Sequence, residues 1–416
     1  MRSNRRRVVV TGLGAITPIG HDVPTYWQNL LAGKSGAGRL SFDLTDMDVQ
    51  IGCEVKGFDP TRAMDAKLAR RTDRFTQFAI CAAVEAVRDA RLDFTKEDLT
   101  RVGVIVGSGM GGILTWEAQF AQFLAKGPKR VSPLLIPMMI PDMASGQIAI
   151  LYGLRGPNYD TTSACASGAH ATGVALQHIR EGSADVMITG GTEAAISRFT
   201  VAAFANMGAL SRRNDEPERA SRPFDKDRDG FVIAEGAGIY VLEELEHARA
   251  RGATIYGELA GFGATADAYH ITAPDPEGKG AAEVMRLAIA DAGLNPEDID
   301  YVNAHGTSTP LNDATEVKAI CEVFGDHARR LLVNSTKSMI GHALGAAGAL
   351  EFVATALSLK HGKVHPTINH ETPDPGVFLD FVKDGARDCR IRAAISNSFG
   401  FGGHNCTLCL VAYQEE

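Results

Sequence analysis

The sequence predicts an α/β protein in which helices cover both faces of a mostly parallel sheet. Of its 416 residues, 45% are hydrophobic and 22% are charged, so the chain can build a sizeable core. Three short Val- and Ile-rich runs end in glycine, at residues 7–14, 101–112 and 186–191. They lack polar alternation, which is typical of strands buried on both faces. Residues 75–91 carry apolar side chains at helical spacing, and alternating strands and helices favour a parallel sheet.

Similar segments occur twice in the same order, which predicts two related halves. The first half has a glycine-ended strand, a small-residue helix and a glycine-rich loop that enters a strand, at residues 101–112, 165–182 and 230–244. In the second half the corresponding segments read IDYVNAHGTSTP, NSTKSMIGHALGAAG and SNSFGFGGHNCTLCLVAY. We therefore expect a duplicated protein.

The seam between the halves is expected near residues 252–256, which gives an N-terminal half at 1–253 and a C-terminal half at 254–416. The helices at 165–182 and 342–362 are rich in Gly and Ala. Because such helices lack bulky side chains, they can pack closely, and we expect them to form a central layer.

Composition excludes several kinds of partner and location. The formal net charge of −8 gives no global attraction to nucleic acid or to a membrane surface. No segment reaches the roughly 18 apolar residues of a membrane span. The apolar run after the N-terminal arginines is too short for a secretory signal. Seven cysteines without framework spacing favour a reducing compartment, so we expect a cytoplasmic protein.

One glycine motif suggests a nucleotide. Gly107, Gly109 and Gly112 form a G-x-G-x-x-G after a predicted strand. In a dinucleotide site this motif opens the first βαβ unit and is followed by an acidic residue about 20 positions later. Here the following segment, WEAQFAQFLAKG, reads as a helix, so an NAD-dependent oxidoreductase is only a minor alternative.

Two other motifs suggest metals, and neither fits. Asp225, Asp227 and Asp229 resemble the start of a calcium loop, but the twelfth position is glycine where a bidentate glutamate is needed. Cys406 and Cys409 form a C-x-x-C in an apolar run without a second pair at zinc spacing. Structural thiols and no metal are expected.

Cys165 is the candidate nucleophile. A polar turn at residues 160–163 leads into a predicted helix and places this cysteine near the helix N-terminus. Free amides and the helix dipole there favour a thiolate. An isolated cysteine among small residues is more often part of a core, so Cys165 alone decides nothing.

Two histidines strengthen the assignment. His305 follows a predicted strand and precedes a threonine-rich loop, and His342 is expected at the start of the helix at 342–362. Each is next to a glycine, which gives a substrate room to approach. Their matching positions in duplicated segments favour a catalytic group over two structural histidines.

The strings TTSACASGAHA, NAHGTSTPLND, STKSMIGHALGAAG and NSFGFGGHN, in this order and spacing, resemble the elongation condensing enzymes of type II fatty acid synthesis. These are the β-ketoacyl-acyl-carrier-protein synthases of the thiolase superfamily, with synthase II as the nearest group. The resemblance covers essentially the whole chain. It implies a thiolase-like fold of five αβαβα layers in two duplicated halves. It also implies decarboxylative condensation of malonyl-acyl carrier protein with an acyl group, which gives a 3-oxoacyl-acyl carrier protein.

By this resemblance, Cys165 accepts the acyl group, and His305 and His342 bind the malonyl thioester and promote its decarboxylation. Loss of carbon dioxide leaves an enolate, which hydrogen-bond donors at the thioester oxygen stabilise. Neutral imidazoles can donate in this way. The resemblance further implies an oxyanion hole made by the backbone N–H groups of Cys165 and Phe401.

The resemblance extends to supporting and lining residues. Lys337 resembles the family's lysine, and Glu351, expected three turns into the His342 helix, resembles its carboxylate partner. A buried lysine is costly without a partner, so we expect the two to be in contact. Four more positions match the family: Thr307 and Thr309 for the phosphopantetheine arm, and Met110 and Phe204 for the acyl pocket.

Some residues limit the resemblance. Met110 stands where many relatives have a smaller or branched residue, which leaves the preferred acyl length open. His404 stands where threonine is frequent. A thiolase would need a second cysteine near the last glycine loop, an initiation synthase would have asparagine in place of His342, and a noncatalytic chain-length partner would lack Cys165. A ketosynthase of an aromatic type II polyketide system has the same Cys-His-His set and remains the alternative.

The implied partners are an acyl carrier protein and a second copy of the chain. No cofactor is expected, because the substrates arrive on the carrier's phosphopantetheine arm. Carrier proteins are acidic, so docking needs a local basic cluster. Lys67, Arg70 and Arg71 match family contacts to the carrier, although most charge runs are only solvated helix faces. A second basic cluster contains Lys126, Lys129 and Arg130.

Overall fold

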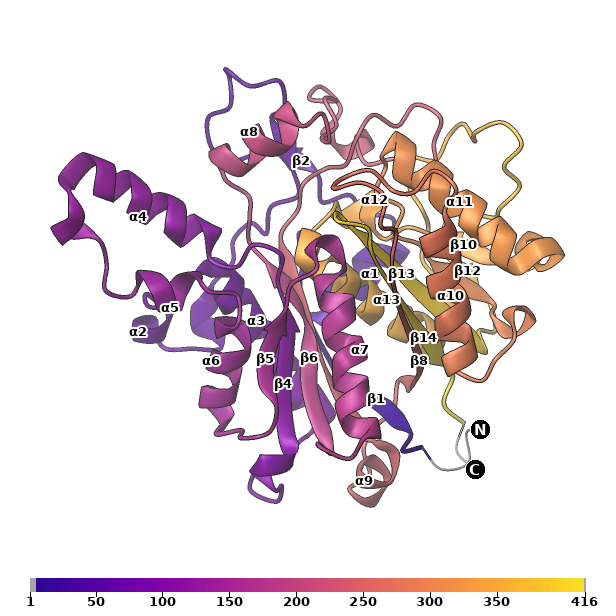
Figure 1. The fold of residues 1–416 in the computed structure, drawn as a ribbon, viewed down its shortest axis with the longest axis horizontal. Coiled ribbons are helices and arrows are strands. Elements are labelled where there is room, and N and C mark those ends of the chain that lie inside the picture. The colour runs from indigo at the N-terminus through magenta and orange to yellow at the C-terminus, as the bar shows by residue number, and fades with distance from the viewer. Residues whose placement is uncertain (1–4, 415–416) are drawn as a thin grey trace.

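The computed structural model describes residues 5–414, which form one ten-stranded sheet and the helices around it (Figure 1). In spatial order the strands are β10 (Leu332–Asn334), β9 (Tyr301–Asn303), β13 (Ala393–Gly400), β14 (His404–Val411), β8 (Gly257–Ala266), β1 (Val8–Ile16), β7 (Gly236–Glu244), β6 (Val186–Glu193), β4 (Val102–Gly107) and β5 (Asn158–Thr161). Two small sheets pair β2 (Gly38–Arg39) with β3 (Ile51–Gly52) and β11 (Lys363–Val364) with β12 (Arg387–Asp388).

The large sheet repeats one strand order. From the middle outward, the first half runs β1, β7, β6, β4, β5, and the second runs β8, β14, β13, β9, β10. In each half, the strand that comes first in the sequence lies at the seam, and the strand that comes last in the sequence lies beside it. β1 and β8 join the halves through the pairs Val9 with Glu258 and Val10 with Gly257. The expected duplication is therefore visible in the topology, while the boundary between 253 and 254 stays a prediction.

The expectation of a mostly parallel sheet is wrong, because the sheet is mixed. Every adjacent pair from β13 across to β6 is antiparallel, and parallel pairing is confined to the two outer ends. An apolar run indicates only that both faces of a strand are covered. In this protein helices cover the antiparallel strands as well as the parallel ones, so the runs did not reveal strand direction. Residues 393–411 form a hairpin, in which β13 precedes the glycine loop and β14 is the strand that the loop was expected to enter.

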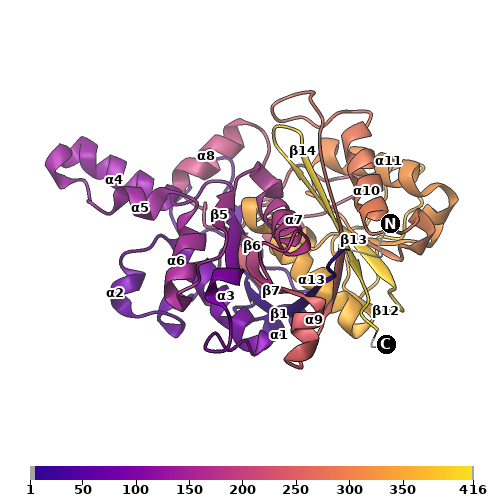
Figure 2. The ribbon, with the colours of Figure 1, turned by 60° about the horizontal axis from the view of Figure 1, so that its bottom comes forward.

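Helices divide the fold into five layers. Figure 2 shows the central helices α7 (Ser167–Arg180) and α13 (Ala347–His361) between the two halves of the sheet. The outer layers comprise α3 (Arg74–Ala90) and α6 (Met143–Tyr152) on the first half, and α10 (Lys279–Asp291) and α11 (Pro310–Phe324) on the second. In α13 all residues from 347 to 359 are buried, as expected for a central helix.

Local signals explain how α3 begins and how it packs. The Asp73 carboxylate accepts from the N–H of Phe75 and caps the helix, and Arg91 ends it in the left-handed conformation with φ 52°. This matches the helix expected at 75–91. A Cβ at Gly14 of β1 would lie 1.9 Å from the Ala82 carbonyl oxygen, so the glycines of the first strand let α3 rest directly on the sheet.

One part of the chain projects from the body. α4 (Ile113–Lys126) and α5 (Leu135–Met139) extend outward on the side of β5, and neither helix has a buried residue (Figure 1). The remaining helices are α1 (Val23–Leu31), α2 (Ala66–Ala69), α8 (Arg198–Asn206), α9 (Leu245–Ala250) and α12 (Lys337–Ile340). Within residues 5–414 no helix has both the length and the apolar character needed to span a membrane.

Candidate active site

Cys165 lies in a 3₁₀ turn, Ala164–Ala166, between β5 and α7. Ser163 before the cysteine and Ser167 after it shape this turn. The Ser167 hydroxyl donates to the Ala164 carbonyl at 2.7 Å and accepts from the Ser163 N–H at 2.9 Å. Ala164 has φ 50°, a left-handed conformation that a side chain rarely adopts. Strain of this kind is maintained where the surrounding structure holds it, and here it orients the cysteine.

The expectation of a thiolate at the helix N-terminus is wrong for this structure. Cys165 precedes α7 by two residues, and burial raises the pKa of its thiol to about 11. The Lys337 ammonium and the backbone N–H groups of Phe401 and of Cys165 itself act in the opposite direction. The helix dipole is a small effect beside full desolvation, so the thiol holds its proton at neutral pH.

His305 lies two residues after the end of β9, and hydrogen bonds to its backbone fix its position. Its N–H and that of Gly306 each donate to one oxygen of Glu316 at 2.8 Å. The Lys337 ammonium donates to the His305 carbonyl at 2.7 Å and lies 3.3 Å from Nδ1 of the ring. An ammonium at Nδ1 requires that nitrogen to accept, so the ring proton belongs on Nε2.

His342 is not at the start of a helix, contrary to expectation. It follows α12 and precedes α13 by five residues, because a second 3₁₀ turn, Leu344–Ala346, intervenes. Its backbone is fixed by the 2.8 Å bond from its N–H to the Val232 carbonyl. Nδ1 of its ring is buried and finds no hydrogen-bond partner among the described residues, which leaves Nε2 as the open nitrogen.

The two imidazoles face one another. Their ring centroids lie 5.4 Å apart and the ring planes are 87° to one another. Burial lowers the pKa of both rings well below the usual range, and the Lys337 ammonium lowers it further. Both histidines are therefore neutral hydrogen-bond donors near pH 7.

The expected contact between Lys337 and Glu351 is present. The ammonium of Lys337 donates to Oε1 of Glu351, and both side chains are almost completely buried. Because α13 begins at Ala347, Glu351 lies in the second turn of its helix rather than the third. Burial raises the pKa of the Glu351 carboxyl to about 7, against the effect of the lysine.

Cys165, His305 and His342 line one cavity of about 480 Å³. Residues from both halves of the chain therefore meet there. Its lining also includes the other residues expected to contact substrate: Met110, Phe204, Thr307, Thr309 and Phe401. The hydroxyls of Thr307 and Thr309 are 2.9 Å apart.

The predicted docking residues lie elsewhere. Lys67 is in α2, and Arg70 and Arg71 follow it; all three side chains are exposed and none lines the cavity. The second basic cluster is at the end of α4 and in the turn after it, and is also exposed.

Two buried glutamates were missed by sequence reasoning. Glu316 of α11 fixes the backbone at His305, and Glu193 at the end of β6 borders the cavity. The available signal was a carboxylate inside an otherwise apolar or small-residue segment, as in ITGGTEAAI. Glu193 also accepts the N–H groups of Gly109 and Met110, the donors that a dinucleotide phosphate would need from the G-x-G-x-x-G loop.

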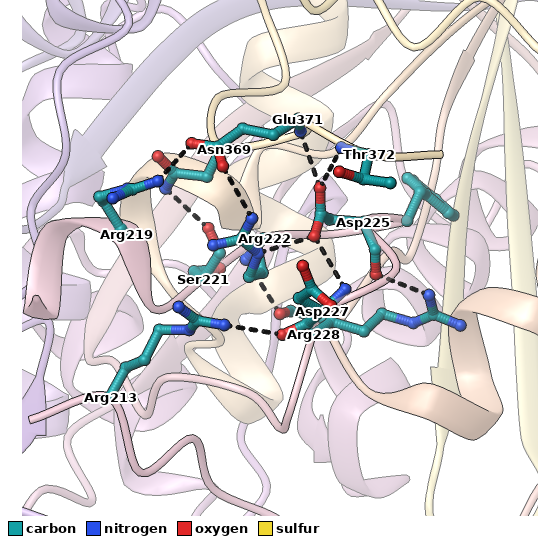
Figure 3. A network of polar contacts seen from close by, with 12 residues as sticks. Arg213, Arg219, Ser221, Arg222, Asp225, Asp227, Arg228, Asn369, Glu371 and Thr372 are labelled. Atoms are coloured by element: carbon teal, nitrogen blue, oxygen red, sulfur yellow. Dashed lines mark hydrogen bonds and ion pairs between the residues drawn. The ribbon is translucent and has the colours of Figure 1, made fainter. Parts of the chain in front are cut away.

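The acidic run at Asp225 is part of an ion-pair network rather than a calcium loop (Figure 3). Asp225 is buried and accepts from Arg222 at 2.9 Å and from the N–H groups of Glu371 and Thr372 at 2.7 Å. Burial opposes the charge, but these donors outweigh it and hold the pKa of Asp225 at about 2.

That network supports the threonine loop, since the Arg222 N–H donates to the hydroxyl of Ser308 at 2.9 Å. Cys406 and Cys409 are buried on β14. Within residues 5–414 no group of three or more His, Cys, Asp or Glu side chains is placed to hold a metal.

Family models match both halves of the chain. The model "Beta-ketoacyl synthase, N-terminal domain" matches residues 5–248, and "Beta-ketoacyl synthase, C-terminal domain" matches residues 256–371. The chain is 53% identical over 411 residues to 3-oxoacyl-[acyl-carrier-protein] synthase 2 of Synechocystis sp., with 99% of each chain covered. It is 53% identical over 407 residues to the protein of the same description from Staphylococcus aureus, with 98% of each covered.

Solved structures share the fold. A type II PKS ketosynthase in complex with its acyl-carrier protein superposes with a TM-score of 0.92 at 36% identity, covering 99% of this chain and 100% of that one. A β-ketoacyl synthase from Burkholderia phymatum gives a TM-score of 0.91 at 36% identity, covering 98% and 100%. The thiolase-like fold and these relatives define an acyl-transferring condensing enzyme. The chain belongs to the β-ketoacyl synthase family.

Proposed function

We propose that Cys165 holds the acyl group and that His305 and His342 hold the malonyl thioester while it loses carbon dioxide. The reaction is the decarboxylative condensation of fatty acid elongation, which extends an acyl chain by two carbons to a 3-oxoacyl-acyl carrier protein. The observation that carries the assignment is the single cavity in which one thiol and two neutral imidazoles meet.

In the first step the Cys165 sulfur attacks the incoming acyl thioester, and its proton leaves with the carrier's thiol. The thiol starts protonated, so the N–H groups of Phe401 and Cys165 stabilise both the forming thiolate and the oxyanion of the tetrahedral intermediate. Lys337 favours the same anions from further away.

In the second step the malonyl carboxylate leaves as carbon dioxide and its electron pair forms an enolate. Nε2–H of His305 and of His342 donate to the thioester oxygen, where the negative charge collects. The enolate carbon then attacks the acyl carbonyl on Cys165, and the Cys165 thiolate leaves and regains a proton. This last proton comes from solvent, one for each turnover, because the malonyl carboxylate leaves as neutral carbon dioxide and the first thiol proton has left with the carrier.

The partner proposed for the cavity is an acyl carrier protein. Relatives carry the carrier in their description, and one similar structure is a ketosynthase with its acyl-carrier protein. The arm would enter past the hydroxyls of Thr307 and Thr309, and the acyl chain would extend past Met110 and Phe204. Lys67, Arg70 and Arg71 are exposed cations that would attract the acidic carrier.

A second copy of the chain is the other proposed partner. β5 is the last strand of the sheet, and within residues 5–414 no strand pairs with its outer edge. Phe120, Phe123 and Leu124 of α4, the helix that projects from the body on the side of β5, are 46%, 41% and 68% exposed. An unpaired strand edge and exposed apolar side chains on the same side of the molecule favour a symmetric dimer there. A cytoplasmic location stays a proposal, supported by the free thiols of Cys53 and Cys406.

The test is mass spectrometry of the protein after incubation with acyl carrier protein loaded with an acyl chain. We expect one added acyl group on Cys165, release of carbon dioxide when malonyl carrier is added, and a 3-oxoacyl carrier as product. Cys165→Ala should abolish condensation, whereas Cys321→Ala, which removes a half-buried thiol outside the cavity, should not. Acylation at another residue would overturn the assignment. Use of aromatic polyketide intermediates in place of fatty acyl chains would favour the polyketide alternative.

A further inference from the structure

Glu193, the last residue of β6, is a completely buried carboxylate at the wall of the cavity. Within residues 5–414 it forms no ion pair with a lysine, arginine or histidine. The condensation described above does not use it. A buried carboxylate without a counter-charge is costly unless several hydrogen bonds satisfy it.

Four donors satisfy Glu193, two at each oxygen. Oε1 accepts from the Ser108 hydroxyl at 3.0 Å and the Met110 N–H at 3.1 Å. Oε2 accepts from the Gly109 N–H at 2.8 Å and the Gly345 N–H at 3.0 Å. The carboxylate therefore joins the turn at residues 108–110 to the 3₁₀ turn at 344–346, which belong to different halves of the chain.

Both turns form the wall of the cavity. Met110 lines it from the first turn and Leu344 from the second. The turns approach so closely that a Cβ at Gly109 or at Gly345 would lie 2.7 Å from Oε2 of Glu193. Only glycine at these two positions lets one carboxylate reach both backbones.

The bonding pattern requires an acceptor at both oxygens. A protonated carboxyl or an amide would carry a hydrogen of its own on one side, and that hydrogen would point at a backbone N–H that already donates to Glu193. Burial nevertheless raises the pKa of Glu193 to about 7. The negative charge of Glu193 also raises the pKa of the Cys165 thiol.

We propose that Glu193 is a positioning residue that fixes the distance between the Met110 turn and the Leu344 turn and thereby sets which acyl chains the cavity accepts. The inference rests on the proposed function, in which this cavity receives the acyl chain. Glu193 contacts no reacting atom in this role. It acts through the two turns that it joins.

Glu193→Gln tests the role, because the amide nitrogen cannot accept a hydrogen bond. In place of Oε1 it would face the Met110 N–H, and in place of Oε2 the N–H groups of Gly109 and Gly345. Acyl loading on Cys165 is measured by mass spectrometry with butanoyl and hexadecanoyl carrier protein. We expect loading of the long chain to fall about tenfold relative to the short one. Removing the negative charge should also speed alkylation of Cys165 by iodoacetamide. A loosened site would expose the thiol and speed alkylation too, so the rate is compared only where the urea unfolding midpoint of the variant matches that of the wild type.

Equal loss for both chain lengths, an unchanged chain preference, or slower alkylation would each overturn the inference. Should Glu193→Gln not fold, Ser108→Ala removes one of the four donors and keeps the charge, and a smaller shift of preference in the same direction is expected. Glu243→Gln is the matched control, because Glu243 is also a completely buried glutamate at a strand of the first half but does not line the cavity. It should leave the chain preference unchanged.

If the wild-type protein loads neither chain, the proposed function fails. If it loads both chains and Glu193→Gln keeps the preference, only this inference fails.

Discussion

The ammonium of Lys337 donates to the backbone carbonyl of His305 at 2.7 Å and lies 3.3 Å from the Nδ1 atom of the same residue. One buried cation thus sets both the position and the tautomer of the His305 ring. Glu351 in turn neutralises that cation inside the protein.

Lys337→Ala should therefore damage both stability and decarboxylation. It leaves Glu351 buried without its partner, which costs about 3 to 5 kcal/mol of unfolding free energy. In the double variant Lys337→Ala/Glu351→Ala much of the stability should return, while decarboxylation stays low because the proton of His305 is no longer directed to Nε2. Urea unfolding and carbon dioxide release measure the two effects. Recovery of both together in the double variant would contradict the tautomer argument.

His305→Ala and His342→Ala should each slow malonyl decarboxylation about 100-fold, which is typical for loss of one donor to an oxyanion. Some acyl transfer to Cys165 should remain, because neither ring holds the Cys165 proton. Carbon dioxide release and acylation are measured separately for each variant. Unchanged release in either variant would remove that histidine from the mechanism.

The pKa of both rings is lowered, so they stay neutral as the pH falls through the ordinary histidine value near 6.5. Wild-type decarboxylation should accordingly show no loss assignable to histidine protonation between about pH 6 and pH 8.

The exposed face of α4 predicts a dimer that a single charge can weaken. Phe123→Asp places a carboxylate in the exposed apolar face of α4 and should shift the protein toward monomer in light scattering at micromolar concentration. Leu287→Asp on α10 is the control, because both side chains are 41% exposed. A monomeric wild-type protein, or equal effects of the two changes, would contradict the proposed interface.

Carrier docking predicts a substrate-specific loss. Reversing Lys67 and Arg71 to Glu should weaken use of carrier-bound substrate, most strongly at low salt, and leave reaction with small acyl thioesters nearly unchanged. Lys96→Glu with Lys363→Glu makes the same change in net charge elsewhere, at one exposed and one partly exposed lysine. Equal losses on both kinds of substrate would show that the cluster is structural.

His247 predicts a stability change in alkaline solution. Its ring lies 2.8 Å from Glu243 and 2.9 Å from Glu97, and these carboxylates raise its pKa to about 9. A raised pKa stabilises the folded state below the unfolded value of about 6.5, and the contribution is lost as pH rises through about 9. After allowance for partial exposure, about 2 kcal/mol should disappear between these values. His247→Gln should flatten this part of the curve of unfolding free energy against pH.

The sequence predicts the nucleophile and the two histidines because their neighbours carry local signals: a polar turn before Cys165 and glycines beside His305 and His342. It predicts the buried helices for a similar reason, since Gly and Ala dominate them. The roles of Lys337, Glu351 and Phe401 come from the family resemblance alone. Of these, the contact between Lys337 and Glu351 is confirmed, and the roles in catalysis stay predictions.

Strand direction and the state of the thiol could not be read in the same way. Burial of an apolar run is independent of the direction of its neighbour, so the runs that form β1 and β7 were expected in a parallel sheet although these two strands pair antiparallel. The acidity of Cys165 depends on how completely the fold removes water from it, which is decided by segments far away in the chain. Glu193 was missed because its four donors come from two distant turns.

The strand pairs that join β1 to β8 have an evolutionary consequence. Cys165 belongs to the first half of the chain and both imidazoles to the second, so neither half alone holds the three residues that meet in the cavity. An ancestral single unit would have had to associate with its own copy, each contributing one turn to the common chamber.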